Sequence, residues 1–389
     1  MLHGFSAADG TEKIAYVPKG VIPSLSQLTD PGYNNSHKFF VDGSPMTGDV
    51  DMGAGVQDPD DPNYNPAYTP GWRTVLVGTL GRGGKGYFVL DVTNPNASND
   101  ANGALGFTAG NALDLVKLDR SRGAGEPTPD CVTGLNSAQQ TACNNAWTED
   151  KDIGHITAQP VLDDTNPMRT TQITRMNDNR WAVVLGNGYN STNQRPVLLI
   201  QYLDGAMELK RIVAAPNDAP GTGNAADNGL AAPRLMDLNG DGRPDVAYAG
   251  DNLGNMWKFD LTSQIASQWN VAFGGAPLFT ARGPASLGSA SRTKVQPITA
   301  PPTVRANDRS MTIGTGPGAK TVSVGGMMVA FGTGRNVTKD DEATVDVQTL
   351  YSVLDNTRYE TVTTNNQKRL KVHPGGGTCP NGPNCVPAP

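Results

Sequence analysis

The sequence predicts an all-β protein, a β-propeller with long loop insertions, and three observations support this prediction. The 389 residues include 46 glycines and 29 prolines, and only 17% are charged, which is typical of a chain with many short strands and turns. Amphipathic helical periodicity is scarce. A hairpin unit also recurs, in which a strand closing on Gly is followed by a polar loop and by a strand closing on Asp.

Four copies of this unit are "TVLVGTLGRGGKGYFVLDV", "WAVVLGNGYNSTNQRPVLLIQYLDG", "DVAYAGDNLGNMWKFDL" and "MMVAFGTGR" followed by "VQTLYSVLD". Their second strands align at 87–91, 199–204, 256–260 and 350–355, and residues 1–10 look like another second strand without its first. We therefore expect the chain to begin inside a hairpin, as a piece of a longer exported protein. Repeated hairpins favour a propeller, because radial repetition leaves only short, protected edges. A β-sandwich is the alternative.

The whole chain, residues 1–389, is predicted to form a single domain, since no linker interrupts it. Polar insertions at 49–70, 121–150 and 281–325 are too poor in apolar residues for core elements, so we expect surface loops there and a tail at 357–389. Five aromatic residues lie on predicted strands and are expected in the blade core: Tyr87, Phe88, Trp257, Phe259 and Tyr351.

Charge and hydropathy argue against two kinds of partner. The formal net charge is −6, whereas phosphate binding needs a basic face, so a nucleic acid partner is disfavoured. No apolar run approaches the roughly 18 residues of a membrane-spanning helix. The N-terminus also lacks the charged and apolar regions of a signal peptide.

The four cysteines form two local pairs in polar loops, Cys131 with Cys143 and Cys379 with Cys385. This pattern predicts two disulfides in an oxidising compartment. A zinc site is the alternative, although the spacing matches no common zinc motif.

The segment "MDLNGDGRPDVAYAG", residues 236–250, carries oxygen-bearing side chains at alternate positions, which is typical of a calcium loop. Gly242 stands where an EF-hand loop needs its sharp turn, but Tyr248 replaces the bidentate Glu and the flanks look like strands. We predict a calcium loop on a hairpin, and a water-solvated cluster of Asx turns is the alternative. The predicted Ca²⁺ ligands are Asp237, Asn239, Asp241, the backbone carbonyl of Arg243, and Asp245.

A second, weaker calcium candidate lies at residues 58–65, "DPDDPNYN", where the prolines favour a solvated turn.

The sequence contains few patterns typical of catalytic sites, and we predict no enzyme activity. The four histidines, at positions 3, 37, 155 and 373, have no metalloprotease or haem spacing. The glycine-rich segments "GRGGKG" (81–86) and "GNGYNST" (186–192) lack the phosphate-loop spacing and are predicted hairpin turns.

Seven segments appear in the order seen in the C-terminal domain of PilY/PilC-type proteins: "MLHGFSAADG", "LVGTLGRGGKGYFVLDVTNP", "DIGHITAQPVL", "WAVVLGNGYNS", "MDLNGDGRPDVAYAGDNLGNMWKFDL", "PITAPPTV" and "MVAFGTGR". The chain resembles this family over nearly its whole length. The resemblance implies a modified, seven-bladed propeller with one calcium loop, whose ligands fall on the five positions named above.

The PilY/PilC-type proteins are tip-associated adhesins and biogenesis factors of type IV pili. The resemblance therefore implies an exported protein at the bacterial cell surface, outer membrane or pilus tip. Its expected partners are minor pilins of the tip and a host-cell or abiotic surface, and its expected roles are pilus extension against retraction, adhesion and twitching motility. Two alternatives remain: a quinoprotein-like propeller dehydrogenase, because "WKFD" strands occur in that group, and a structural scaffold with a permanently bound calcium.

Overall fold

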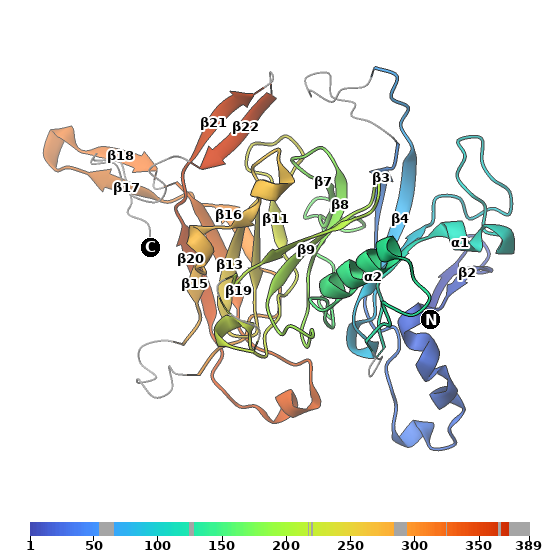
Figure 1. The fold of residues 1–389 in the computed structure, drawn as a ribbon. Coiled ribbons are helices and arrows are strands. Elements are labelled where there is room, and N and C mark those ends of the chain that lie inside the picture. The colour runs from blue at the N-terminus through green and yellow to red at the C-terminus, as the bar shows by residue number, and fades with distance from the viewer. Residues whose placement is uncertain are drawn as a thin grey trace.

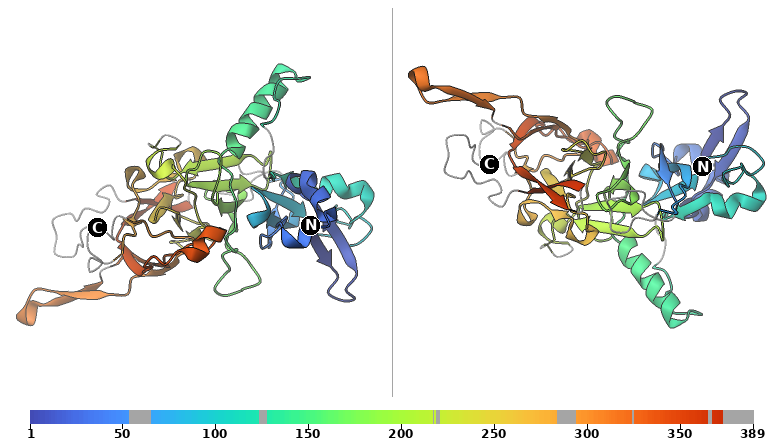
Figure 2. Two further views of the ribbon diagram at one scale, coloured as in Figure 1. Left: turned by 90° about the horizontal axis from the view of Figure 1, so that it is seen from below. Right: turned by 90° about the horizontal axis from the view of Figure 1, so that it is seen from above.

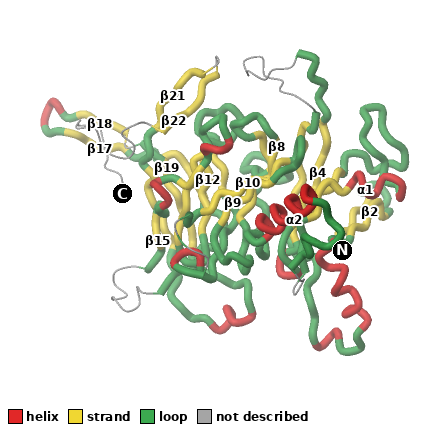
Figure 3. Tube along the Cα trace, in the orientation of Figure 1, coloured by secondary structure: helices red, strands yellow, loops and turns green. Residues whose placement is uncertain are grey.

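The computed structural model describes residues 1–53, 66–123, 128–216, 218, 221–283, 294–323, 325–364 and 367–372. Over these residues the regular secondary structure consists mainly of antiparallel strands, as the sequence predicts (Figures 1 and 3). Four meander sheets follow one another along the chain.

Each of these four sheets takes its strands from one stretch of the chain. The first sheet holds β3 (Met46–Asp51), β4 (Trp72–Thr79), β5 (Tyr87–Asp91) and β6 (Val116–Asp119). The second holds β7 (Ile173–Arg175), β8 (Trp181–Gly186), β9 (Val197–Tyr202) and β10 (Leu209–Val213). The third holds β11 (Arg234–Met236), β12 (Val246–Gly250), β13 (Asn255–Asp260), β14 (Asn270–Val271) and β15 (Phe279–Thr280). The fourth holds β16 (Thr303–Ala306), β19 (Met327–Gly332) and β20 (Leu350–Asp355).

Three separate hairpins accompany the four sheets: β1 (Leu2–Phe5) with β2 (Glu12–Tyr16), β17 (Ser310–Ile313) with β18 (Lys320–Ser323), and β21 (Tyr359–Thr364) with β22 (Gln367–Val372). The α-helices are α1 (Ala112–Leu115) and α2 (Ser137–Asp150). The 3₁₀ turns are η1 (Lys19–Thr29), η2 (Tyr33–Asn35), η3 (Gly81–Gly83), η4 (Ala109–Asn111), η5 (Gly223–Ala225), η6 (Ala266–Gln268), η7 (Phe273–Gly275), η9 (Gly316–Gly318) and η10 (Lys339–Ala343). Helix α2 and the β17–β18 hairpin project from the body of the molecule (Figure 2).

The hydrophobic core lies between neighbouring sheets. In β8 and β9, alternate side chains point to opposite faces, so Val184 and Leu198 pack toward the third sheet while Val183 and Leu199 pack toward the first. Every residue of β9 is buried. Each sheet therefore covers a face of the next, which is the stacking expected of propeller blades.

The recurring Asp at the end of the second strand has a local cause. Asp260 Oδ1 accepts hydrogen bonds from the backbone N–H and the hydroxyl of Thr262, at 3.0 and 2.7 Å. The same arrangement ends β5 at Asp91 and β20 at Asp355. The carboxylate thus turns the chain out of the strand, because it offers the backbone a partner outside the ladder.

The recurring Gly at the end of the first strand allows the backbone of a neighbouring segment to approach closely. A Cβ on Gly186 would lie 1.9 Å from the carbonyl oxygen of Ala231, which belongs to the segment that enters the third sheet. The next residue, Asn187, is fully buried and accepts the backbone N–H of Leu230 at 2.9 Å. The segment 186–192 therefore forms a blade-to-blade contact as well as the predicted β8–β9 connection.

The boundaries of the predicted surface loops are wrong in part. Residues 49–51 belong to β3, residues 303–306 form β16, and residues 137–150 form helix α2. Within residues 49–51 the buried apolar side chain is Val50, and in β16 it is Val304. Helix α2 has no buried residue, so its sequence lacks the apolar periodicity that would predict a helix. The predicted C-terminal tail forms the hairpin β21–β22 over its described part.

Candidate metal centre

The predicted calcium loop connects the first two strands of the third sheet. Strands β11 and β12 pair with Met236 opposite Val246, so the residues between them form the tip of a hairpin, as predicted. Gly240 and Gly242 have φ angles of 78° and 82°, in the left-handed region that glycine adopts at little cost. These two glycines allow the chain to reverse within a few residues.

Asp237 holds the loop closed. Its Oδ1 accepts the backbone N–H groups of Asn239, Gly240 and Asp241 at 3.2, 2.7 and 3.3 Å. Its Oδ2 accepts the backbone N–H of Gly242 at 2.7 Å. The carboxylate therefore sits inside a ring of amides that all point toward one negative charge.

Asp241 lies on the exposed side of the loop but has basic neighbours. Its Oδ2 accepts a hydrogen bond from Arg369 Nη1 at 3.0 Å and lies 3.9 Å from Arg243 Nη1. Asn239 Nδ2 is 3.3 Å from the same oxygen, and Asn239 Oδ1 accepts the backbone N–H of Asp241 at 2.9 Å. A guanidinium group thus stands beside the loop where positive charge is most needed.

Asp245 lies at the base of the loop and is only 1% exposed. Its Oδ2 accepts the backbone N–H of Leu238 at 2.8 Å. Burial raises the pKa of the Asp245 carboxyl to about 6, and the nearby charges of Asp241 and Asp237 act in the same direction. Asp245 thus adds a buried carboxyl group beneath the exposed acidic side chains of Asp237 and Asp241.

The donor set fits a hard cation. The loop offers carboxylate, amide and carbonyl oxygens and no sulfur or imidazole, which is the chemistry that Ca²⁺ prefers. Among the described residues no three His, Cys, Asp or Glu side chains gather as a group that could hold a metal ion. The structure places Asp237, Asn239 and Asp241 together on the loop and Asp245 beneath them, and the complete ligand set stays a prediction.

Two residues that the sequence analysis missed contact this site. Asn177, fully buried, donates hydrogen bonds to the carbonyls of Pro244 and Leu261 at 3.0 and 2.9 Å, and accepts one from Arg369 at 3.3 Å. Arg369 lies on β22, 128 positions from Asp241. No local pattern links such distant positions, so the sequence held no signal for this contact.

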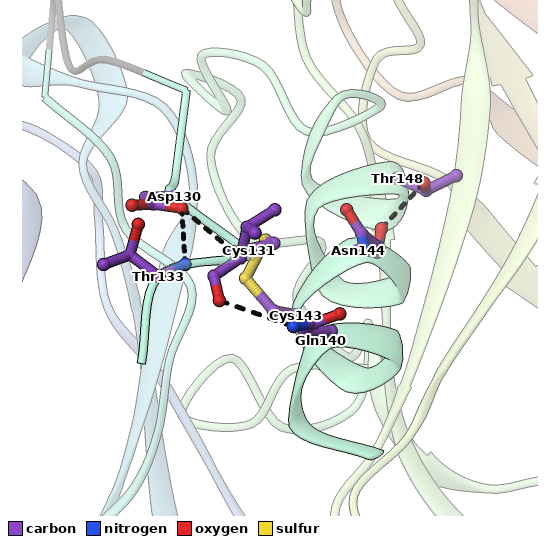
Figure 4. The surroundings of a disulfide bond; sticks show 8 residues. Asp130, Cys131, Thr133, Gln140, Cys143, Asn144 and Thr148 are labelled. Atoms are coloured by element: carbon purple, nitrogen blue, oxygen red, sulfur yellow. Dashed lines mark hydrogen bonds between the residues drawn. A yellow bond between two sulfur atoms is a disulfide. The ribbon is translucent and has the colours of Figure 1, made fainter. Parts of the chain in front are cut away.

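The predicted disulfide between Cys131 and Cys143 is confirmed, with the Cα atoms 5.5 Å apart, and it rules out a zinc site at this pair (Figure 4). Helix α2 carries Cys143, and a capping box between Asn136 and Gln139 begins the helix. Neither the second cysteine pair nor the weaker calcium candidate at 58–65 lies within the described residues.

A family model described as "PilY1 beta-propeller domain" matches residues 1–114 and 150–373. The chain belongs to this family. The match covers strands of all four sheets and confirms both the propeller prediction and the resemblance, while the number of seven blades stays a prediction. It leaves out residues 115–149, which include the disulfide and nearly all of α2.

Proteins similar to this chain carry names of the same family. The chain is 34% identical over 376 residues to the type IV pilus biogenesis factor PilY1 of Pseudomonas aeruginosa strain PAO1, covering 91% of this chain and 24% of that protein. It is 30% identical over 364 residues to a PilY1 homolog of Xylella fastidiosa, covering 91% and 18%. The crystal structure of the P. aeruginosa PilY1 C-terminal domain superposes with a TM-score of 0.53 at 29% identity, covering 91% of this chain and 55% of that one. The chain thus spans about a quarter or less of these curated relatives.

No helix in the described part of the chain is both long enough and apolar enough to cross a membrane.

Proposed function

We propose that this chain is the calcium-binding propeller of a type IV pilus biogenesis factor, supporting pilus extension against retraction, twitching motility and adhesion. The observation that carries this proposal is the family match across the strands of all four sheets. The relatives are named as pilus biogenesis factors, which favours a binding role over the quinoprotein-like alternative.

The stacked sheets supply a rigid frame, and the loop at 237–245 supplies the proposed response to calcium. Bound Ca²⁺ would neutralise Asp237, Asp241 and Asp245 and order the loop against β12. Without the ion, repulsion among these carboxylates is offset only by the backbone amides around Asp237 and by Arg369 beside Asp241, so we expect a looser loop. Extracellular calcium modules bind at about 10⁻⁴ to 10⁻³ M, so a site in this range would respond to environmental calcium. Binding well below about 10⁻⁶ M would indicate a permanent structural ion instead.

The proposed partners are minor pilins at the pilus tip and a host-cell or abiotic surface. The proposed location is outside the cell, at the outer membrane, cell surface or pilus tip. The disulfide between Cys131 and Cys143 supports this location, because disulfides persist in oxidising compartments.

Calorimetric titration with Ca²⁺ tests the site directly. We expect one binding event in the parent chain and none in the double variant Asp237→Ala, Asp241→Ala. The matched control is Asp340→Ala, Glu342→Ala, which also removes two exposed acidic side chains at alternate positions. A parent chain without calcium binding, or a double variant that still binds, would refute the calcium site.

A cellular test addresses the pilus role. The same double substitution, introduced into the full-length protein in its source bacterium, is expected to change twitching distance and surface attachment severalfold, while the control variant leaves both unchanged. Incubation of the chain with pyrroloquinoline quinone and calcium is expected to give no redox activity. Normal twitching and attachment in the double variant would contradict the proposed role of calcium.

A further inference from the structure

Arg369 is a buried cation on strand β22, and its carboxylate partner, Asp241, lies on the loop between β11 and β12. It lies on β22 and is 4% exposed. Its Nη1 lies 3.0 Å from Asp241 Oδ2 on the calcium loop and 3.3 Å from Asn177 Oδ1. Because burying an arginine without a carboxylate is unfavourable, this ion pair stabilises the seating of β22 on the propeller.

Over the described residues, the β21–β22 hairpin is attached to the propeller through side chains. Its two strands pair with each other and, over the described residues, with no further strand. A crevice of about 500 Å³, lined by residues such as Val362, Arg369 and Asn270, separates it from the third sheet. Tyr359 provides a second contact, since it packs against the core between the third and fourth sheets and Lys258 Nζ lies 5.3 Å from the centre of its ring. A two-stranded hairpin is at best marginally stable alone, so these side-chain contacts matter for its order.

The contact on the calcium loop uses the same carboxylate that a bound ion would use. Asp241 is the third of the alternating oxygen positions in the loop, and its Oδ2 faces Arg369. A divalent cation inside the loop would draw this carboxylate inward and would repel the guanidinium beside it. Ca²⁺ and Arg369 would therefore compete for the charge of Asp241, and each would weaken the binding of the other.

We propose that Arg369 acts as a built-in competitor of calcium, so that calcium binding releases the β21–β22 hairpin from the propeller. This inference rests on the calcium site proposed above. Coupling between two sites is reciprocal: if calcium loosens the hairpin, then removing the Arg369 contact strengthens calcium binding by the same factor. Electrostatic repulsion between a divalent ion and one nearby charge corresponds to about a tenfold change in the dissociation constant.

Calcium titration of the whole chain and two variants tests this coupling at one ionic strength. Arg369→Gln removes the ion pair, and Lys368→Gln is the matched control, since it removes one positive charge from the adjacent exposed position of the same strand. We expect about tenfold tighter binding in Arg369→Gln, and at most about a twofold change in Lys368→Gln because screening by salt weakens exposed charges. Hydrogen exchange of the amides of β21 and β22 in the parent chain is expected to become faster when calcium is added.

The outcomes separate the two proposals. If the parent chain binds no calcium, the proposed calcium site fails. If the parent binds calcium but Arg369→Gln binds with equal or weaker affinity, the competition is refuted and the calcium site stands. Exchange in the hairpin that is unchanged or slowed by calcium refutes the release in the same way, without depending on how well a variant folds.

Discussion

A buried ion pair joins the third and fourth sheets and gives a quantitative stability prediction. Lys258 Nζ lies 2.5 Å from Asp355 Oδ2 and 2.8 Å from the Thr357 hydroxyl, and the side chains of Lys258 and Asp355 are each 2% exposed. The Tyr248 hydroxyl donates to the same carboxylate at 2.6 Å. Burial alone would raise the pKa of the Asp355 carboxyl, but Lys258 and these hydrogen bonds outweigh it and lower the pKa.

The substitution Lys258→Met keeps most of the apolar stem of the side chain and leaves the Asp355 carboxylate without its cation. Breaking one side of a buried pair destabilises a protein by about 3–5 kcal/mol. Because Tyr248 and Thr357 still donate to the carboxylate, we expect the low end, about 3 kcal/mol. With about 2.1 cal/mol/K of unfolding entropy per residue, a chain of this length loses about 4 °C in Tm.

Urea unfolding and calorimetry of Lys258→Met, Asp355→Asn and the double variant measure this pair. The control is Lys294→Met, which removes a surface ion pair with Asp346 whose side chains are 65% and 41% exposed. We expect a change of less than about 1 kcal/mol for the control. The double variant is expected to be more stable than the sum of the two single effects by at least about 1.5 kcal/mol.

The pH dependence has a definite sign. Since the folded pKa of Asp355 is lowered, its contribution is complete above the unfolded pKa of about 3.9 and is lost as the pH falls through the folded pKa. The Lys258→Met variant should therefore lose less stability on acidification than the parent chain. The reasoning is refuted if Lys258→Met destabilises no more than Lys294→Met, or if the two single effects simply add.

Three further predictions concern other contacts. The fully buried Asp152 accepts hydrogen bonds from Arg195 at 2.8 Å and Arg211 at 2.6 Å, which lowers its pKa despite burial, so its stabilisation is lost as the pH falls. Asp152→Asn should lower the free energy of unfolding by about 3 kcal/mol at pH 7 and should make that free energy depend less on pH below neutrality. Urea unfolding at several acidic pH values measures this, and an unchanged pH dependence would contradict it. In calorimetry, Cys143→Ser should lower the free energy of unfolding by about 3 kcal/mol under oxidising conditions and leave it unchanged under reducing conditions. Gly186→Ala places a methyl group 1.9 Å from the carbonyl oxygen of Ala231 and should lower the free energy of unfolding by about 2 kcal/mol or more. An unchanged free energy of unfolding would refute the close contact between blades.

Local patterns in the sequence were sufficient for the repeating unit and for the loop. Strands closing on Gly and Asp are visible because each residue answers a local demand, a close approach at Gly186 and a hydrogen-bonded turn at Asp260. The alternation of Asp237, Asn239 and Asp241 with a glycine bend is likewise a property of consecutive residues. The disulfide between Cys131 and Cys143 was predictable because its partners are 12 positions apart.

Only the tertiary structure decided which side chains meet across segments. Helix α2 has no apolar face, and β16 depends on one buried valine, so neither gave a periodic signal. The pairing of Lys258 with Asp355 and of Arg369 with Asp241 joins residues about a hundred positions or more apart. Such contacts arise when sheets stack and a hairpin folds back on them, and the energy of burying a charge selects partners by distance in space, which the order of residues along the chain does not record.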